Sequence, residues 1–550
     1  MRLLMIAGAL GLLASCTDAP RLVEDSVSAP DVAAVSSDPA AIERLTADVA
    51  YLASDELEGR EAGEPGYDLA AAFVAGRYAE LGLEAVGDDG SYYQNVTFRG
   101  FRSNMLGGAV VSMTGGEEVS WEPNVDFLGA STQVAASLED TPVVFAGYGF
   151  VSEAYGRDDY AGLDVDGKVV ALIWGAPKFL PSEEQAHYRS VQSQAASERG
   201  AVGVIRLLLP SFEENRRPFD TFVANAARSA TLRWVNAEGD AHSTAPNIVG
   251  GLIMGQEGAT KLFASMGRDW QEIAALAEAE EGALEAFETG LQISMRFDNS
   301  VDDFESPNVV GLVPGTDPSL ADEVVVVTAH LDHVGVSGIG EDKVHNGAMD
   351  NAVGIAALLE AARKVAENPV ARPVLFAAVT AEEKGLLGSD YLARHNPVGD
   401  APYAANINLD MPVLTFPFED LIGFGAERSS LGPVVAEATA ALGVTLSPDP
   451  MPEQGLFTRS DHYSFVKQGV PSLFLFVGFG GRGAEEFPAF LATHYHKPSD
   501  EVDLVMFDQL ERFANLNAGI ISTVGNMDET PTWVAGDFFG TAFNGPMADQ

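Results

Sequence analysis

An α/β fold with more than one domain is predicted by three features of the sequence. Residues 324–328 form a β-branched run that is typical of a buried strand. From residue 308 to residue 527, such apolar runs alternate with helical patterns, for example over 355–365. A second alternation of strand-like and helical segments spans 141–209. Because 550 residues exceed what one hydrophobic core supports, we expect these alternations to belong to separate domains.

The predicted elements follow in chain order. Two helices precede residue 83 and are separated by the sequence DELEGR, and strand-like segments follow between 92 and 128. A helix is predicted at 192–200 and a mostly helical stretch at 245–288. The strands predicted in the middle of the chain cover 141–148, 169–174, 203–209 and 291–297. We therefore divide the chain into the first part of a main domain (41–131), an inserted domain (132–250), the rest of the main domain (251–527) and a loosely attached C-terminal segment (528–550).

The composition is that of a globular protein, with 46% hydrophobic and 20% charged residues. Thirty-two Lys and Arg against 80 Asp and Glu give a formal net charge of −48. Since phosphate binding needs clustered basic side chains, this balance excludes nucleic acid as a partner. Strong acidity is otherwise a property of a well-solvated surface.

The N-terminal residues have the pattern of an export signal. Residues 3–13 are apolar but too few to span a bilayer, and Cys16, the single cysteine of the chain, follows them. This pattern resembles the lipobox of bacterial lipoproteins, which implies cleavage before Cys16, lipidation of that residue and export to the periplasmic or cell-surface side of a membrane. The alternative is an ordinary signal peptide with an incidental cysteine. Residues 17–40 are then a flexible tether, and the anchor is the only predicted membrane contact.

Histidines and carboxylates collect at the predicted strand ends of the main domain. Seven of the nine histidines lie between positions 330 and 496. The carboxyl ends of strands in an open α/β sheet are where ligands bind. Two neighbouring carboxylates, Glu382 and Glu383, follow one strand and project in opposite directions if the chain there is extended. The residues at these positions are His330, Asp332, Asp350, Glu382, Glu383, Asp410 and His496.

The motifs around these residues resemble one known family. The sequences AHLDH, GAMDN, TAEE, NLDM and YHKPSD are similar to those of the co-catalytic zinc aminopeptidases of metallopeptidase family twenty-eight. The inserted segment, with FAGYGF and ASERGAVGVI, resembles a protease-associated domain. The resemblance implies a mixed-sheet zinc-exopeptidase domain with helices on both faces, and the insertion of the second domain within it.

The resemblance also implies a site with two zinc ions. Asp350 would bridge the ions, and two groupings of the other ligands are open. In the first, His330 and Glu383 each bind one ion. In the second, His330 and Asp410 bind one ion while Glu383 and His496 bind the other. We prefer the second, because each ion then has an imidazole and a terminal carboxylate.

The resemblance also implies roles for three further residues. Glu382 would be the general base, and Tyr495 would donate a hydrogen bond to the oxyanion. Asp332 would accept a hydrogen bond from a metal-binding histidine, since such a histidine commonly donates its other N–H to a nearby carboxylate. The expected activity is release of N-terminal residues from peptides. A carboxypeptidase using Arg459 or Arg482, or a binding protein on the same scaffold, is the alternative.

Other residues near these motifs are open to more than one interpretation. His333 and His345 are predicted to be exposed loop histidines rather than groups facing a substrate. His494 is set aside in favour of His496. The pair Asp461–His462 either lines the substrate cleft or forms a structural turn. The G-x-G-x-x-G sequence at 478–483 is predicted to be a loop at the cleft, because the residues after it, with a proline, make a poor helix for a dinucleotide site.

Overall fold

The computed structural model describes residues 37–549, except 104–108, 114–117, 216 and 338–339. The predicted signal, Cys16 and most of the tether lie outside the described residues. Within the part of the chain that is described, no helix is both long enough and apolar enough to span a membrane.

The main domain is built on a mixed sheet, as predicted. Three parallel strands form its centre, β18 (Val374–Val379), β17 (Val324–His330) and β19 (Tyr403–Asn408), and β22 (Ser472–Val477) continues parallel to β19. The order of the main path is β1-β16-β18-β17-β19-β22-β20-β21, and β2 also pairs with β16. The outer strands are β1 (Glu84–Ala85), β2 (Tyr93–Gln94), β16 (Asn308–Val313), β20 (Asp420–Phe424) and β21 (Thr445–Ser447).

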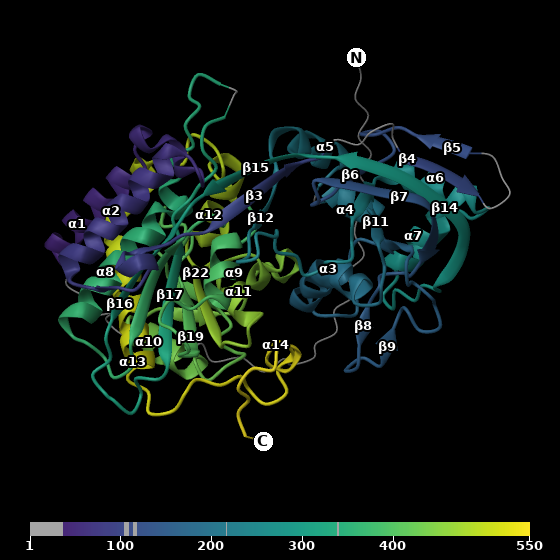
Figure 1. Cartoon of the computed structure of the whole chain (residues 1–550). Coiled ribbons are helices and arrows are strands. Elements are labelled where there is room, and N and C mark those ends of the chain that lie inside the picture. The colour runs from purple at the N-terminus through teal and green to yellow at the C-terminus, as the bar shows by residue number, and fades with distance from the viewer. Residues whose placement is uncertain (1–36, 104–108, 114–117, 216, 338–339, 550) are drawn as a thin grey trace, which may run out of the picture. The chain divides into compact units, whose positions relative to one another are not determined.

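Both faces of this sheet are covered, which explains the unbroken apolar run of β17. Val325 and Val327 pack into one hydrophobic cluster, and Val324 and Val326 pack into another on the opposite face. The first face is covered by α1 (Pro39–Leu52), α2 (Pro65–Leu81), α8 (Val353–Glu367) and α13 (Phe507–Gly525). The second face carries α9 (Leu387–Arg394) and α11 (His462–Val466). Figure 1 shows these helices around the sheet.

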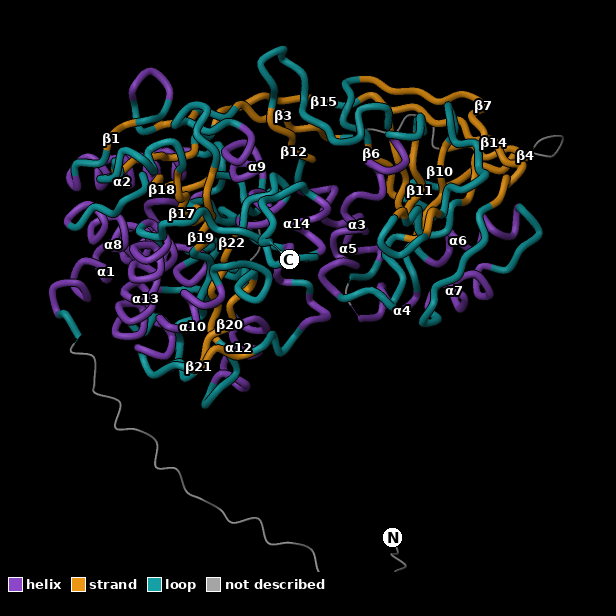
Figure 2. The backbone as a smooth tube through the Cα atoms, turned by 90° about the horizontal axis from the view of Figure 1, so that it is seen from below, coloured by secondary structure: helices purple, strands orange, loops and turns teal. Residues whose placement is uncertain are grey.

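The second sheet is larger than the predicted insertion. Its strand order is β5-β4-β14-β7-β10-β11-β13-β6, so strands before residue 132 and after residue 250 belong to it. The strands are β4 (Ala109–Met113), β5 (Glu118–Trp121), β6 (Leu128–Ala130), β7 (Ala135–Phe145), β10 (Val169–Ile173), β11 (Gly203–Leu207), β13 (Gly250–Met254) and β14 (Phe287–Asp298). The long pairing of β14 with β7 joins residues far apart in sequence, and local patterns do not reveal it. The strands of both sheets are orange in Figure 2.

Helices and smaller strands complete the described chain. The helices with the second sheet are α3 (Ser182–Ser197), α4 (Pro210–Asn215), α5 (Phe219–Arg228), α6 (Gln256–Ser265) and α7 (Trp270–Glu278). A three-stranded sheet contains β12 (Thr231–Trp234), β3 (Thr97–Arg102) and β15 (Ser300–Glu305), and β8 (Val151–Ser152) pairs with β9 (Arg157–Asp158). Short turns of helix are η1 (Asp55–Arg60), η2 (Asp88–Gly90), η3 (Ala348–Ala352), η4 (Pro452–Gln454), η5 (Leu456–Thr458) and η6 (Val502–Leu504). The remaining helices are α10 (Gly432–Ala441), α12 (Gly483–Thr493) and α14 (Phe538–Ala542).

Two predictions about the C-terminal third are wrong. Residues 528–550 are not loosely attached, because the Trp533 side chain is fully buried and its Nε1–H donates to the Gly469 carbonyl at 2.8 Å. The residues after G-x-G-x-x-G do form a helix, α12, although Pro488 lies inside it. Phe487 and Phe490, both buried, hold that helix against the main core, and this packing outweighs the cost of the proline.

Candidate metal centre

Three neighbouring strands end at the same edge of the main sheet. His330 is the last residue of β17, Glu382 and Glu383 follow β18, and Asp410 follows β19. Because β17 is parallel to both neighbours, the carboxyl ends of the three strands lie side by side. The strand ends thus bring together residues separated by up to 80 positions in the chain.

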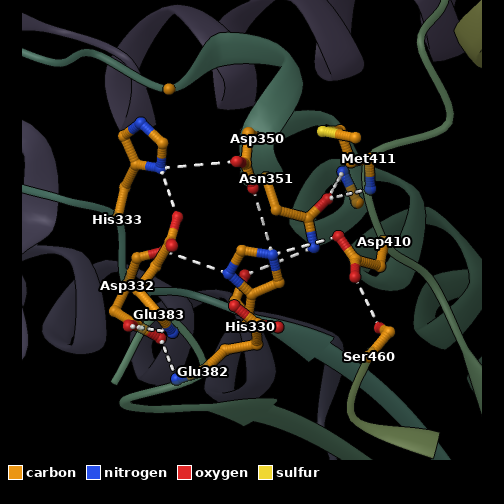
Figure 3. A network of polar contacts seen from close by, with 12 residues as sticks. His330, Asp332, His333, Asp350, Asn351, Glu382, Glu383, Asp410, Met411 and Ser460 are labelled. Carbon is orange, nitrogen blue, oxygen red and sulfur yellow. Dashed lines mark hydrogen bonds and ion pairs between the residues drawn. The ribbon is translucent and has the colours of Figure 1, made fainter. Parts of the chain in front are cut away.

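Asp350 reaches this edge from η3, just before α8. The backbone N–H groups of Met349 and Asp350 donate to the Asp500 carboxylate at 2.9 and 3.1 Å. The Asn351 side chain accepts from the Met411 N–H at 3.0 Å and donates to the Leu409 carbonyl at 2.9 Å. These bonds fix the η3 turn to the strand end that carries Asp410 (Figure 3).

The ligand-type side chains form two groups that share Asp350. In the first, His330 Nε2 lies 3.1 Å from Asp410 Oδ1 and 3.3 Å from Asp350 Oδ1. In the second, His496 Nε2 lies 3.1 Å from both Asp350 Oδ2 and Glu383 Oε1. Within each group the ligand atoms lie within 4.8 Å of one another. These distances have the arrangement of the second predicted grouping, with one oxygen of Asp350 toward each group.

His333 also belongs to the second group, and the prediction that it is an exposed loop residue is wrong. Its side chain is fully buried, and its Nδ1 lies 3.0 Å from Glu383 Oε1 and 3.8 Å from Asp350 Oδ2 (Figure 3). The backbone N–H of His333 donates to the Arg60 carbonyl at 3.2 Å, so the N-terminal part of the chain encloses it. The available sequence signal was the second histidine of AHLDH, three residues after His330.

The other histidines in question lie outside both groups. His345 is half-buried, and His494 Nδ1 lies 2.9 Å from the Ser499 carbonyl. The choice of His496 over His494 therefore agrees with the geometry. Asp461 and His462 are fully buried and do not line the cavity, which favours the structural interpretation of this pair.

Arg60 is a buried residue for which no role was predicted from the sequence. Its guanidinium donates to the Leu331 carbonyl at 3.0 Å, to the Asn346 carbonyl at 2.7 Å and to the Gly347 carbonyl at 3.0 Å. It therefore joins the loop that follows His330 to the loop that precedes Asp350. Burial lowers the pKa of Arg60 to about 10, so the group keeps its positive charge beneath the carboxylates.

Asp332 supports the centre differently from the prediction. The Nδ1 of His330 faces the backbone carbonyl of Asp332, at 3.1 Å, rather than its carboxylate. The carboxylate instead accepts the backbone N–H groups of Glu382 and Glu383 at 3.0 and 3.3 Å. Burial raises the pKa of Asp332 to about 6. This side chain thus orients the loop that carries both glutamates.

The first group has a hydrogen-bonded support of its own. Asp410 Oδ2 accepts from the Ser460 hydroxyl, and that hydroxyl accepts from Asn408 Nδ2 at 2.6 Å. Asn408 Oδ1 in turn accepts from the Thr328 hydroxyl at 2.7 Å. All of these groups are buried, so the Asp410 carboxylate is held in a fixed orientation.

The pKa values of the two neighbouring glutamates shift in opposite directions. Burial raises the pKa of Glu382 well above its ordinary value, and the Glu383 and Asp410 charges raise it further. Burial also opposes ionisation of Glu383, but the hydrogen bond with His333 and the imidazole of His496 beside it lower its pKa to about 2. Glu383 is therefore a permanent anion, while Glu382 is a group that can gain and lose a proton.

The residues present fit a pair of metal ions. His496 Nε2 lies 3.1 Å from two carboxylate oxygens but makes no hydrogen bond, which leaves a buried nitrogen unsatisfied. Burial lowers the pKa of His496, yet Asp350 and Glu383 raise it to about 10, so the anions favour a positive charge at this point. Imidazole nitrogen and carboxylate oxygen are the donors that zinc takes in catalytic sites. Each group offers such donors.

A cavity of about 270 Å³ opens onto the first group and part of the second. Glu382 lines it, whereas Glu383 does not, as expected for neighbours that project in opposite directions. The Tyr495 ring lies on the cavity wall and stacks on His496 with ring centres 3.8 Å apart. The apolar part of the wall consists of Met411, Met451, Leu456, Phe474, Phe476, Phe487 and Leu491.

The two arginines considered for a carboxypeptidase have different positions. Arg459 lines the cavity, but Arg482 is exposed outside its lining and pairs with Glu486. The G-x-G-x-x-G loop next to Arg482 is already filled by Asp420, whose Oδ1 accepts the Gly480 N–H at 2.7 Å. A Cβ at Gly478 would lie 2.1 Å from the same carboxylate. A dinucleotide phosphate therefore has no room at this helix.

Comparison with known proteins finds a family match in the segment that contains these residues. Residues 308–521 match the family model "Peptidase family M28", and this segment contains both ligand groups. Over 228 residues the chain is 27% identical to the aminopeptidase YwaD of Bacillus subtilis, covering 41% of this chain and 46% of the relative. It is 28% identical over 228 residues to a probable leucine aminopeptidase 2 of Aspergillus oryzae, covering 40% of this chain and 41% of the relative.

The matched region thus spans less than half the length of these two curated relatives. A solved aminopeptidase from Aneurinibacillus sp. strain AM-1 covers 89% of this chain and 95% of its own, at 18% identity and a TM-score of 0.47. Residues 308–521, which hold every residue of the two ligand groups, are the segment that this chain has in common with peptidase family M28.

Proposed function

We propose that this protein is a zinc-dependent aminopeptidase that releases N-terminal residues from peptides. The observation that carries the proposal is the position of Asp350, which turns one oxygen toward each of two histidine–carboxylate groups at the edge of a cavity. The match of residues 308–521 to the M28 family model and the similarity to two proteins named as aminopeptidases support it.

The residues of the two groups would hold two zinc ions. His330 and Asp410 would bind one ion, and Glu383, His496 and His333 the other, with Asp350 between them. Bound there, zinc supplies an acidified water and polarises the scissile carbonyl. The hydrogen bonds from Ser460 and Asn351 hold the ligand-bearing segments in place, so the protein does not have to reorganise them during the reaction.

Glu382 would move the proton during hydrolysis. Its carboxylate lines the cavity, and no hydrogen bond to another side chain of the described chain occupies it. A carboxylate with a raised pKa can accept a proton from the attacking water and deliver it to the leaving amine. Burial raises the pKa of Tyr495, so its hydroxyl stays protonated and can donate a hydrogen bond to the oxyanion.

The cavity suits the N-terminal end of a peptide. Glu382, a cavity-lining carboxylate outside both ligand groups, can accept a hydrogen bond from the ammonium group of a free N-terminus. The apolar wall, with Phe474 and Phe476, favours an apolar first side chain. A volume of about 270 Å³ has room for little more than one or two residues. We therefore expect exopeptidase action rather than cleavage inside a chain.

The test compares free and blocked substrates with soluble protein that begins at residue 37. Leucyl-p-nitroanilide, its N-acetyl derivative and an N-blocked peptide with a free C-terminus are assayed before chelation, after chelation and after zinc is restored. The proposal expects hydrolysis of the first substrate only, lost on chelation and recovered with zinc. Release from the C-terminus would establish a carboxypeptidase instead. Zinc binding without turnover of any substrate would support a binding protein.

We also propose that the protein is exported and anchored through Cys16. The apolar run at 3–13 and the single cysteine after it support this. Cells expressing the full chain and the Cys16→Ser variant are fed an alkyne-tagged fatty acid. Label on the first protein only is expected, and equal label or none on both would contradict the anchor.

A further inference from the structure

Arg459 is the one lysine or arginine among the described residues that line the cavity at the metal centre. The same cavity contains the carboxylates of Asp350, Glu382 and Asp410. Asp350 and Asp410 belong to the ligand groups, so among the cavity-lining residues outside the metal centre Arg459 has the one permanent positive charge. A ligand with an anionic group matches it.

The guanidinium of Arg459 is not engaged elsewhere. Within the described part of the chain, it has no carboxylate within 4.0 Å and no hydrogen bond from its side chain. Two other arginines of the main domain are paired: Arg482 contacts Glu486, and Arg428 contacts Glu183 and Asp537. With 80 acidic residues in the chain, a free arginine beside a cavity is available for an anion from outside.

The backbone that carries Arg459 is fixed from two directions. Its N–H donates to the Leu456 carbonyl at 3.0 Å, and the next residue, Ser460, donates its hydroxyl to Asp410. On the other side, η4 and η5 pack against α3, and a Cβ at Gly455 would lie 3.2 Å from the Cβ of Ala186. The backbone position of Arg459 relative to the metal centre is therefore fixed, while its exposed side chain can turn toward a ligand in the cavity.

We propose that Arg459 binds a carboxylate on the residue that follows the scissile bond. This inference rests on the proposed aminopeptidase function and names its substrate class: dipeptides, whose C-terminal carboxylate lies there, and peptides with an acidic second residue. The first side chain meets the apolar wall, and the carboxylate meets the guanidinium.

The test measures kcat/KM for matched pairs of substrates on the zinc-loaded protein. Leucyl-glycine is compared with leucyl-glycinamide, and the α-amide of leucyl-aspartate with the α-amide of leucyl-asparagine. The first pair reports a main-chain carboxylate and the second a side-chain carboxylate. We expect at least one carboxylate substrate to be preferred about tenfold, the effect of one charge-assisted hydrogen bond. The preference should weaken as salt is added.

Two variants test whether Arg459 causes the preference for carboxylate substrates. Arg459→Gln should remove the preference by lowering kcat/KM on the carboxylate substrate about tenfold more than on its amide partner, and Arg459→Lys should keep part of it. Arg482→Gln, at an exposed arginine outside the cavity, is the matched control and should leave every ratio unchanged. A wild-type protein that hydrolyses both members of each pair equally would overturn the inference, as would a preference that survives in Arg459→Gln. If no leucyl substrate is hydrolysed, the proposed function itself fails, and this inference fails with it.

Discussion

Buried histidines lie in opposite electrostatic surroundings in two regions of this chain. In the metal centre, burial lowers the pKa of the fully buried His330, but the neighbouring carboxylates raise it well above its ordinary value. At α3, burial lowers the pKa of His187 to about 4, and the rings of Phe538 and Phe543 pack around it. The Nδ1 of His187 lies 2.8 Å from the Tyr463 hydroxyl, which is uncharged.

The difference shows what distinguishes a metal site from a structural histidine. Both regions hide imidazoles from solvent, so burial alone does not separate them. The carboxylates do, because anions around His330 and His496 favour a cation, whereas aromatic rings around His187 favour a neutral imidazole. Substitutions in the first region should therefore change metal binding and activity, and a substitution in the second should change stability.

The largest effect is expected from Asp350→Asn. The amide keeps the size of the side chain but removes the negative charge that both groups share. Both zinc ions should bind more than about 100-fold more weakly, and activity should fall to background. Zinc content after dialysis against micromolar zinc measures this. His187→Gln is the control and should keep both ions. Equal zinc content in the two variants would contradict the distinction between the metal centre and the structural histidine.

Glu382→Gln should lower kcat by about 10²–10⁴ while zinc content stays unchanged, because Glu382 lines the cavity without belonging to either ligand group. Glu383→Gln is the matched control, since the neighbouring residue belongs to a ligand group and its loss should remove zinc. The measurement is kcat together with bound zinc for both variants. Loss of zinc from Glu382→Gln would show that the two glutamates do not have separate roles.

His333→Gln should weaken one zinc ion and spare the other. His333 contacts Glu383 and Asp350 but lies outside the group of His330 and Asp410, so we expect a fall of about 10–100-fold at a single position. Competition with a chelator measures the two affinities. His494→Gln, two residues from His496 but outside both groups, should have no effect. A variant that binds both ions normally would place His333 with the structural histidines.

The smallest effect is a loss of stability in acid that depends on His187. Its pKa is about 4 in the folded protein and 6.5 in the unfolded chain, so the unfolded state binds the extra proton between these values. Stability is therefore lost as the pH falls from 6.5 to 4, by on the order of 2–3 kcal/mol. Lys467 also lowers this pKa, and the Tyr463 hydroxyl is the contacting polar group.

Urea unfolding at pH 7 and at pH 4.5 measures this loss. Other groups titrate equally in wild type and in His187→Gln, so the difference between the two proteins isolates this residue. The variant should lose about 2 kcal/mol less than wild type over that interval. An identical loss in both proteins would mean that His187 is not neutral in the fold.

Local sequence patterns were sufficient where the physical cause is local. The strand β17 has both faces buried, and its β-branched run shows this directly. Of the residues of both ligand groups, His330, Glu383 and Asp410 lie at strand ends and Asp350 precedes a helix, where a polar residue after an apolar run is visible in the sequence. His496 follows helix α12 instead. For the same reason the arrangement of His330, Asp410, Glu383 and His496 agrees with the preferred grouping.

The parts that the sequence did not reveal depend on contacts between distant residues. His333 is buried because the loop of Arg60 lies over it, and Arg60 precedes it by more than 270 positions. Trp533 anchors the C-terminal segment on Gly469. The second sheet extends beyond 132–250 because β14 pairs with β4 and β7. No composition or periodicity near these residues indicates their partners.

Anomalous X-ray scattering at the zinc edge, from crystals of the zinc-loaded protein, tests the central claim most directly. The account predicts two peaks, one among His330, Asp410 and Asp350, and one among Glu383, His496, His333 and Asp350. A single peak, or two peaks that do not share Asp350, would contradict it.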